Sequence, residues 1–255
     1  MNFVITANTD IGITKSTNQD SVALKVLNTR QGRMVLAVLC DGMGGLAKGE
    51  VASASVIRAF DAWARTELPM LSERPIEDAE LRAQWERIVR EQNAAIGAYG
   101  ARQGIRLGTT VVAMLITQSR YYLLNVGDSR AYEITDAARV LTQDQTVVAR
   151  ELAMGMLTEQ QAMTDPRRSV LLQCVGASPE VYPDMFFGTP KTNATYMLCS
   201  DGFRHEITPE EIWAALRPEL LLDDQSMMRS AASLIELNKQ RQERDNITVA
   251  LVRTY

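Results

Sequence analysis

Apolar residues along the chain gather in short runs that are separated by polar and glycine-containing segments. The runs are rich in β-branched and aromatic residues and are bounded by Gly, Asn or Asp, which is the pattern of β-strands. They predict strands at residues 2–7, 21–27, 34–40, 109–117, 121–126, 130–135, 185–188, 195–199 and 246–252. The run at 35–40 leads directly into Asp41 and is far too short to span a bilayer.

Two long segments instead carry apolar residues at the spacing of an amphipathic helix. They cover residues 48–68 and 76–100, and shorter helices are predicted at 208–216 and 224–240. Residues 147–168 predict a helical insertion between strands. Because few helices stand between strands as crossovers, the pattern favours an α+β fold, with antiparallel sheets and helices packed outside them.

Length and charge narrow the classes of function. With 255 residues, of which 46% are hydrophobic, the chain can bury a substantial core and lies near the upper limit for one domain. Its formal net charge of -4 gives no basic excess, so we expect no general nucleic-acid binding. The N-terminus lacks a basic region followed by an apolar one, so we expect no secretory signal, no membrane partner and a cytoplasmic location.

Cysteine and histidine are too sparse for a zinc site or a disulfide framework. Cys40, Cys174 and Cys199 lie far apart without a CxxC spacing, and His205 is the only histidine. We expect the cysteines to be small buried apolar residues, and His205 to be structural or on the surface.

Aspartates stand at the ends of predicted strands. Asp20 precedes one strand and Asp41 follows the next, and the short connection between those strands suits a hairpin. Antiparallel pairing would place the two carboxylates at the same edge. Asp201 and Asp245 are related in the same way at the end of the chain, if their strands pair. Asp128 lies between two further strands, where a hairpin turn alone would explain it.

Carboxylates gathered in this way repel one another. At an effective dielectric constant of about 20, two of them about 5 Å apart repel by roughly 3 kcal/mol. Cations must offset this, and ligands that are all oxygen suit Mg²⁺ or Mn²⁺. The Asp-Gly pairs at 41–42 and 201–202 are also common turn dipeptides. However, Gly42 would let its carbonyl approach a metal closely, and Gly44 and Gly45 would keep the site open.

Eight motifs resemble, in order, those of the metal-dependent Ser/Thr protein phosphatases of type 2C. They are STNQD (16–20), VLCDGMGG (38–45), GTTVV (108–112), NVGDSRAY (125–132), LTQDQT (141–146), LLQCVGAS (171–178), CSDGF (199–203) and RDNITVALV (244–252). Each is weak alone, but together they cover nearly the whole chain. The resemblance implies one catalytic domain over residues 1–255, an α-β-β-α sandwich of two central antiparallel sheets flanked by helix pairs, with a flap insertion at about 147–168.

The resemblance also implies a centre of two Mn²⁺ or Mg²⁺ ions. Asp41 would bridge the two ions, and Asp201 and Asp245 would complete the first. The carbonyl of Gly42 would bind the second ion, with Asp20 reaching it through water.

Further roles follow from the same resemblance. Asp128 would, with Asp201, hold a third ion, as in bacterial members. Lys15 falls where the family has an arginine that grips the substrate phosphate. A hydroxide shared by the two core ions would attack the phosphorus of phosphoserine or phosphothreonine. The implied partners are phosphorylated proteins and a bacterial Ser/Thr kinase that the enzyme opposes, and a monomer is expected.

Three residues depart from the family pattern. Met43 stands where many eukaryotic members carry histidine, Lys15 replaces a bidentate guanidinium by a point charge, and Gln145 replaces a histidine of structural role. None removes an implied ligand, so we expect an active enzyme. The insertion also holds methionines that we expect to fill packing gaps rather than form a recognition surface, namely Met154, Met156 and Met163.

Two other interpretations deserve comparison. Residues 42–49 resemble a phosphate-binding P-loop, but Ala47 precedes Lys48 and Gly49 follows it, so the required Gly-Lys-Ser/Thr order is absent. The second alternative is a catalytically weak or inactive phosphoprotein-binding regulator with the same fold. Retention of all five aspartates argues against it.

Overall fold

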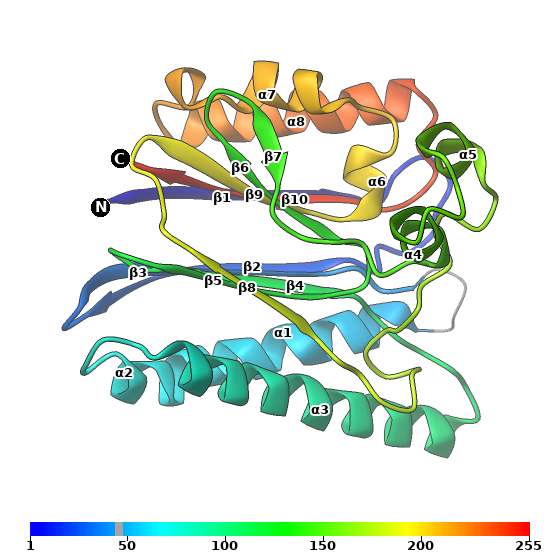
Figure 1. Cartoon of the computed structure of the whole chain (residues 1–255), viewed down its shortest axis with the longest axis horizontal. Helices are drawn as coiled ribbons and strands as arrows, with labels where there is room; N and C mark the ends of the chain where they lie inside the picture. The colour runs from blue at the N-terminus through cyan, green and yellow to red at the C-terminus, as the bar shows by residue number, and fades with distance from the viewer. Residues whose placement is uncertain (44–47) are drawn as a thin grey trace.

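The apolar runs pair into two five-stranded antiparallel sheets in the computed structural model, which describes residues 1–43 and 48–255 (Figure 1). The first sheet contains, in spatial order, β1 (Phe3–Asp10), β10 (Ile247–Thr254), β9 (Ala194–Cys199), β6 (Arg130–Ile134) and β7 (Ala138–Val140). The second contains β2 (Ser21–Thr29), β3 (Gly32–Cys40), β4 (Val111–Ile116), β5 (Tyr121–Val126) and β8 (Asp184–Gly188).

Helices cover the outer face of each sheet (Figure 1). Over the second sheet lie α1 (Gly49–Thr66), α2 (Leu68–Leu71) and α3 (Asp78–Gln103). Over the first lie α7 (Pro209–Leu216), a 3₁₀ turn (Pro218–Leu220) and α8 (Asp224–Gln240). The remaining short helices are α4 (Val147–Ala153), α5 (Glu159–Thr164) and α6 (Asp201–Arg204). The predicted α-β-β-α sandwich is confirmed.

Strand β3 shows why one element is an unbroken apolar run. It lies inside its sheet, with helices on one side and the other sheet on the opposite side, so every residue at 34–40 is buried. Leu36 and Val38 pack in the core beneath α1 and α3, whereas Val35 and Ala37 pack in the core between the sheets. This alternation is the two-residue period of a strand that is buried on both faces.

The elements that the sequence did not predict are short. β7, α2 and α6 have three or four residues each, which is too few to leave a periodic pattern. The strand predicted at 109–117 is shorter in the structure, because Thr109 forms only isolated bridges, to Gly42 and Val175.

The insertion is helical as predicted, but its methionines do not fill the core. Met154, Met156 and Met163 are 67%, 64% and 72% exposed, so the expectation that they act as packing filler is wrong. Helix α5 buries none of its residues. Figure 1 shows α4 and α5 at the end of the sandwich where α6 lies. Throughout the two described ranges, no helix combines the length and the apolar character that a membrane span needs.

Candidate active site

Strand pairing brings four of the predicted acids together as two pairs. Asp20 lies just before β2 and Asp41 just after β3, and these strands pair antiparallel. Asp201 lies just after β9 and Asp245 just before β10, which also pair antiparallel. We call Asp20 and Asp41 the first acid pair, and Asp201 and Asp245 the second. Both strand pairings on which the sequence argument depended are confirmed.

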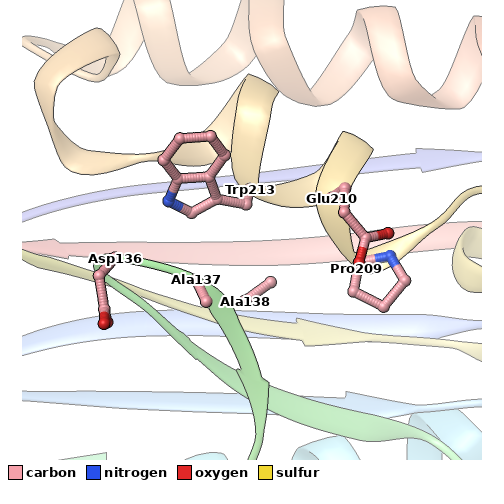
Figure 2. Close-up of a pocket in the computed structure, with 6 residues that line it drawn as sticks. All are labelled: Asp136, Ala137, Ala138, Pro209, Glu210 and Trp213. Carbon is pink, nitrogen blue, oxygen red and sulfur yellow. The ribbon is translucent and has the colours of Figure 1, made fainter.

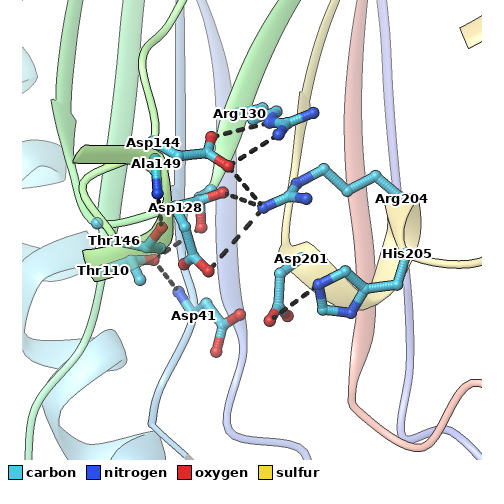
Figure 3. A network of polar contacts seen from close by, with 12 residues as sticks. Asp41, Thr110, Asp128, Arg130, Asp144, Thr146, Ala149, Asp201, Arg204 and His205 are labelled. Atoms are coloured by element: carbon cyan, nitrogen blue, oxygen red, sulfur yellow. Dashed lines mark hydrogen bonds and ion pairs between the residues drawn. The ribbon is translucent and has the colours of Figure 1, made fainter. Parts of the chain in front are cut away.

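Asp128 reaches the same place by a different route. β5 belongs to the second sheet and β6 to the first, so the segment between them crosses from one sheet to the other. The alternative explanation of Asp128 as part of a hairpin turn is therefore wrong. Its side chain is buried, and Figure 3 shows it converging with those of Asp41 and Asp201.

Each Asp-Gly dipeptide lets a second backbone segment come close. A Cβ on Gly42 would lie 2.4 Å from the carbonyl oxygen of Gln19, the residue before the other acid of the first pair. A Cβ on Gly202 would lie 2.3 Å from the carbonyl oxygen of Asn246, the residue after the other acid of the second pair. Both glycines are thus required by close backbone approach, a reason that the sequence alone did not reveal.

The other glycines of the first motif, Gly44 and Gly45, were expected to keep the site open. They lie outside the described residues.

The Asn246 side chain ties the two acid pairs to each other. Its Oδ1 accepts a hydrogen bond from the Gln19 N–H at 2.8 Å, beside the first pair. Its Nδ2 donates to the carbonyl oxygens of Ile11 and Thr17 at 2.9 and 3.3 Å. Sequence reasoning treated Asn246 only as the start of a strand. The sequence feature that could have identified Asn246 is its position: it is an asparagine directly after the candidate metal ligand Asp245.

Burial and mutual repulsion act on the carboxylates. Burial raises the pKa of Asp41 well above its ordinary value, and the charges of Asp20 and Asp201 add to the effect. Burial likewise raises the pKa of Asp20 to about 7, with the charges of Asp201 and Asp245 adding to it. Burial also raises the pKa of Asp128 to about 7, reinforced by the charge of Asp201. The cluster therefore favours any cation that offsets its charge.

Several of these carboxylate oxygens have no hydrogen-bond donor. Both oxygens of Asp20 and Oδ1 of Asp201 are buried and accept no hydrogen bond from the described residues. The hydroxyls of Ser200 and Thr248 lie close enough to favour the ionised form of Asp20. Their hydrogen bonds go elsewhere, because Ser200 Oγ donates to the Thr248 carbonyl oxygen at 3.4 Å and Thr248 Oγ1 pairs with Thr9 Oγ1 at 2.7 Å. Buried oxygens without donors fit a hard divalent cation.

The acids are gathered without closing around a single point. Among residues 1–43 and 48–255, no three acidic, histidine or cysteine side chains make a ready-formed metal-binding group. One expected ligand, Asp245, is engaged by Lys15, whose Nζ lies 2.8 Å from Asp245 Oδ1. Partial burial acts to lower the pKa of Lys15, but its bond to Asp245 and the charge of Asp41 outweigh this, and the pKa is raised. Lys15 is therefore a cation at the edge of the site.

His205 is structural rather than a surface residue. Its Nε2 lies 3.6 Å from Asp201 Oδ2 and its Nδ1 3.4 Å from Glu243 Oε2. Glu243 Oε1 in turn accepts a hydrogen bond from the Asp245 N–H at 2.8 Å. His205 and Glu243 thus connect the two members of the second acid pair. Glu243 is a further residue that the sequence analysis missed.

Two arginines, Arg130 and Arg204, lie beside Asp144 and Asp128 (Figure 3). Arg130 donates two hydrogen bonds to Asp144, both at 2.8 Å. Arg204 Nη2 donates to the carbonyl oxygen of Asp128 at 2.9 Å and contacts Asp144 Oδ2 at 3.3 Å. Burial of the Asp144 carboxylate acts to raise its pKa, yet the two arginines leave that pKa below its ordinary value. Arg204 was not singled out from the sequence.

Gln145 supports the loop that carries Asp128. Its Oε1 accepts from the Gly127 N–H at 2.9 Å, and its Nε2 donates to Asp184 at 2.7 Å. These contacts agree with a structural role at this position.

The cysteines are free and buried, as predicted. Burial raises the pKa of Cys199 to about 12 and that of Cys40 well above its ordinary value. Such thiols stay protonated near neutral pH and are poor nucleophiles.

A separate pocket of about 190 Å³ lies between the β6–β7 turn and α7 (Figure 2). Two of its polar side chains, Trp213 and Asp136, already have partners within the protein. The Trp213 Nε1 donates to the Thr135 carbonyl at 3.0 Å, and Asp136 pairs with Arg139 at 2.7 Å. None of the clustered acids lines it, so the carboxylate cluster is the better candidate site.

Comparison with known proteins agrees with the geometry. Residues 13–233 match the family model described as Protein phosphatase 2C. The chain belongs to the protein phosphatase 2C family. The resemblance inferred from the eight motifs is thereby confirmed.

Relatives of this phosphatase extend over almost all of its length. The serine/threonine phosphatase stp of Listeria innocua is 32% identical over 248 residues, which are 96% of this chain and 93% of that protein. The Mycobacterium tuberculosis phosphatase PstP is 33% identical over 249 residues, which are 96% of this chain but 44% of that longer protein.

Solved structures agree as closely. The Streptococcus agalactiae serine/threonine phosphatase superposes with a TM-score of 0.84 at 28% identity and full coverage of both chains. The PstP catalytic domain in complex with two manganese ions has a TM-score of 0.77 at 31% identity and covers 99% of each chain. The chain is therefore an enzyme of the protein phosphatase class.

The packing around Gly202 predicts that Gly202→Ala disrupts the second acid pair. The added Cβ must push the Asn246 carbonyl away, so unfolding free energy should fall by about 1–3 kcal/mol and phosphatase activity should fall with it. Gly97→Ala is the matched control, because Gly97 lies within α3 and its nearest neighbour is 3.4 Å away. Chemical denaturation and turnover measure both effects. Equal stability and activity of the two variants would contradict the close-approach argument.

Loss of the Asn246 amide should separate the two acid pairs. Asn246→Ala removes three hydrogen bonds and should cost about 2–4 kcal/mol of unfolding free energy. Activity at a temperature where the variant is folded should also fall. Asn93→Ala, which removes two hydrogen bonds between α3 and the backbones of Gly176 and Ser178, should lose stability but keep turnover. If both variants retained full turnover, Asn246 would have only a structural role.

Proposed function

We propose that the phosphatase is a metal-dependent protein serine/threonine phosphatase that hydrolyses phosphoserine and phosphothreonine. The observation that carries the proposal is the set of buried carboxylate oxygens on Asp20 and Asp201, which lack donors and share a space with Asp41. The similarity to the PstP catalytic domain, crystallised with two manganese ions, supports Mn²⁺ or Mg²⁺ as the cofactor.

Within this proposal, the two acid pairs and one carbonyl would hold two ions. Asp41 would contact both ions, Asp201 and Asp245 would hold the first, and the Gly42 carbonyl and Asp20 would hold the second. When bound, the ions supply a water of lowered pKa for attack on phosphorus and stabilise charge on the phosphoryl oxygens. Hard oxygen ligands are the appropriate donor set for this chemistry.

The remaining work falls to residues of the chain. Lys15 turns from Asp245 to the phosphoryl group and offsets its negative charge. No protein nucleophile is used, in keeping with the buried and protonated cysteines. Asn246, His205 and Glu243 hold the backbones that carry the ligands in place.

We also propose the wider setting of the enzyme. Residues 1–255 act as one catalytic domain, with 147–168 as a flap insertion beside the active site. Its partners are phosphorylated proteins and a cognate bacterial Ser/Thr kinase. The enzyme works as a cytoplasmic monomer.

Hydrolysis of a phosphothreonine peptide should require a divalent cation and Asp41. We expect a chelator to abolish turnover, Mn²⁺ to restore it, and Asp41→Ala to lower kcat/KM by more than about 100-fold. Asp136→Ala, at an exposed aspartate of the β6–β7 turn, should behave as wild type. Equal rates for Asp41→Ala and wild type would instead favour a phosphoprotein-binding regulator.

Removal of the Lys15 charge should weaken substrate binding more than turnover. Lys15→Ala should raise KM roughly tenfold, equivalent to about 1.4 kcal/mol of phosphate binding, with a smaller change in kcat. Lys15→Arg should lower KM below that of Lys15→Ala, because a guanidinium can bind phosphate through two donors. Steady-state kinetics decide between the roles. A large fall in kcat at unchanged KM would assign Lys15 to the chemical step.

A further inference from the structure

A nearly buried guanidinium contacts Asp128, one of the two residues that the family resemblance implies for a third metal ion. Arg204 extends from α6 and its side chain is only 11% exposed. Its Nη2 lies 2.9 Å from the Asp128 carbonyl oxygen and 3.9 Å from Asp128 Oδ2 (Figure 3). Asp128 is the residue whose carboxylate would be needed for the third ion.

Arg204 faces two carboxylates, with its Nη2 3.3 Å from Asp144 Oδ2 and 3.9 Å from Asp128 Oδ2. Asp144 accepts two hydrogen bonds from Arg130 in a bidentate pair and contacts Arg204 at 3.3 Å with one oxygen only. Two arginines therefore face two aspartates. Arg130 already offsets the charge of Asp144, so the positive charge of Arg204, which lies between Asp144 and Asp128, also acts on Asp128.

A contribution to folding stability does not by itself explain why an arginine occupies position 204. Arg204 Nε is buried and has no acceptor among the described residues, so the side chain leaves one of its donors unpaired. Buried ion pairs can often be replaced by apolar groups without loss of stability. A functional reason is therefore needed for a fixed cation in this position.

A divalent cation on Asp128 would have to sit beside that fixed positive charge. Like charges in a poorly solvated site repel strongly, and the carboxylate that should attract the ion is already partly compensated. Asp128 and Asp201 therefore do not fit a third ion in this chain. We propose that Arg204 is a built-in cation that takes the place of the third metal ion and positions Asp128.

The inference rests on the proposed two-metal centre and predicts its stoichiometry. Wild type should bind two Mn²⁺ ions per chain, counted by electron paramagnetic resonance of free Mn²⁺ and by titration calorimetry. Arg204→Gln should gain a third, weaker site. Arg204→Lys, which keeps the charge, should stay at two. Combining Arg204→Gln with Asp128→Asn should return the count to two, because the uncovered ligand is removed.

Two results would overturn the inference. One is a wild-type chain that binds three Mn²⁺ ions and loses one of them in Asp128→Asn. The other is a folded Arg204→Gln that still binds only two. If Arg204→Gln does not fold, the comparison of wild type with Asp128→Asn carries the test, and both should bind two ions. Fewer than two ions in wild type, or turnover without a divalent cation, would instead contradict the proposed function.

Discussion

Repulsion among buried carboxylates is the constraint around which one end of this sandwich is built. Five aspartates distant in sequence gather there, with Asp245 at the exposed edge, and burial with mutual repulsion raises the pKa of Asp41, Asp20 and Asp128. The surrounding structure holds them there. Gly42 and Gly202 permit backbone contacts that no side chain would allow, and the Asn246 amide ties the resulting acid pairs together. These features are costly for a fold, and the proposed binding of divalent cations by the acids would explain them.

The acid pairs could be predicted from the sequence because antiparallel pairing is a local rule. Once β2 and β3 are joined by a short turn, the residue before one and the residue after the other must meet. The position of Asp128 could not be predicted in this way. Its segment passes from one sheet to the other, and a crossover between sheets leaves the same glycine-containing pattern as a hairpin.

Residues that act through contacts distant in sequence were missed for a related reason. Glu243 contacts His205, and Arg204 contacts Asp128 and Asp144, across 38, 76 and 60 positions of the chain. The periodic pattern of apolar residues along the sequence carries no information about contacts between residues so far apart. The methionines of the insertion show the opposite limit. Met usually fills gaps in a core, yet Met163 lies on a helix that buries no residue, and Met154 and Met156 lie in the turn after α4, so all three are exposed. The residue type indicates that a side chain is apolar, but the packing of its segment against the rest of the fold decides whether that side chain is buried.

The number of metal ions that the site can hold depends on how many of its negative charges are already offset by side-chain cations. The carboxylates of the two acid pairs and Asp128 face two fixed cations, Lys15 at one edge and Arg204 at the other. Arg130 and Asp144 balance each other. With all five acids ionised, three negative charges remain uncompensated. The two divalent ions of the proposed centre would more than offset them, and a third ion would add two further positive charges. An arginine that cannot lose its proton fixes that balance permanently, whereas a third metal ion would make it depend on the cation concentration of the cell. With Arg204 in place of the third ion, the charge beside Asp128 would therefore stay constant, instead of varying with the concentration of free divalent cations.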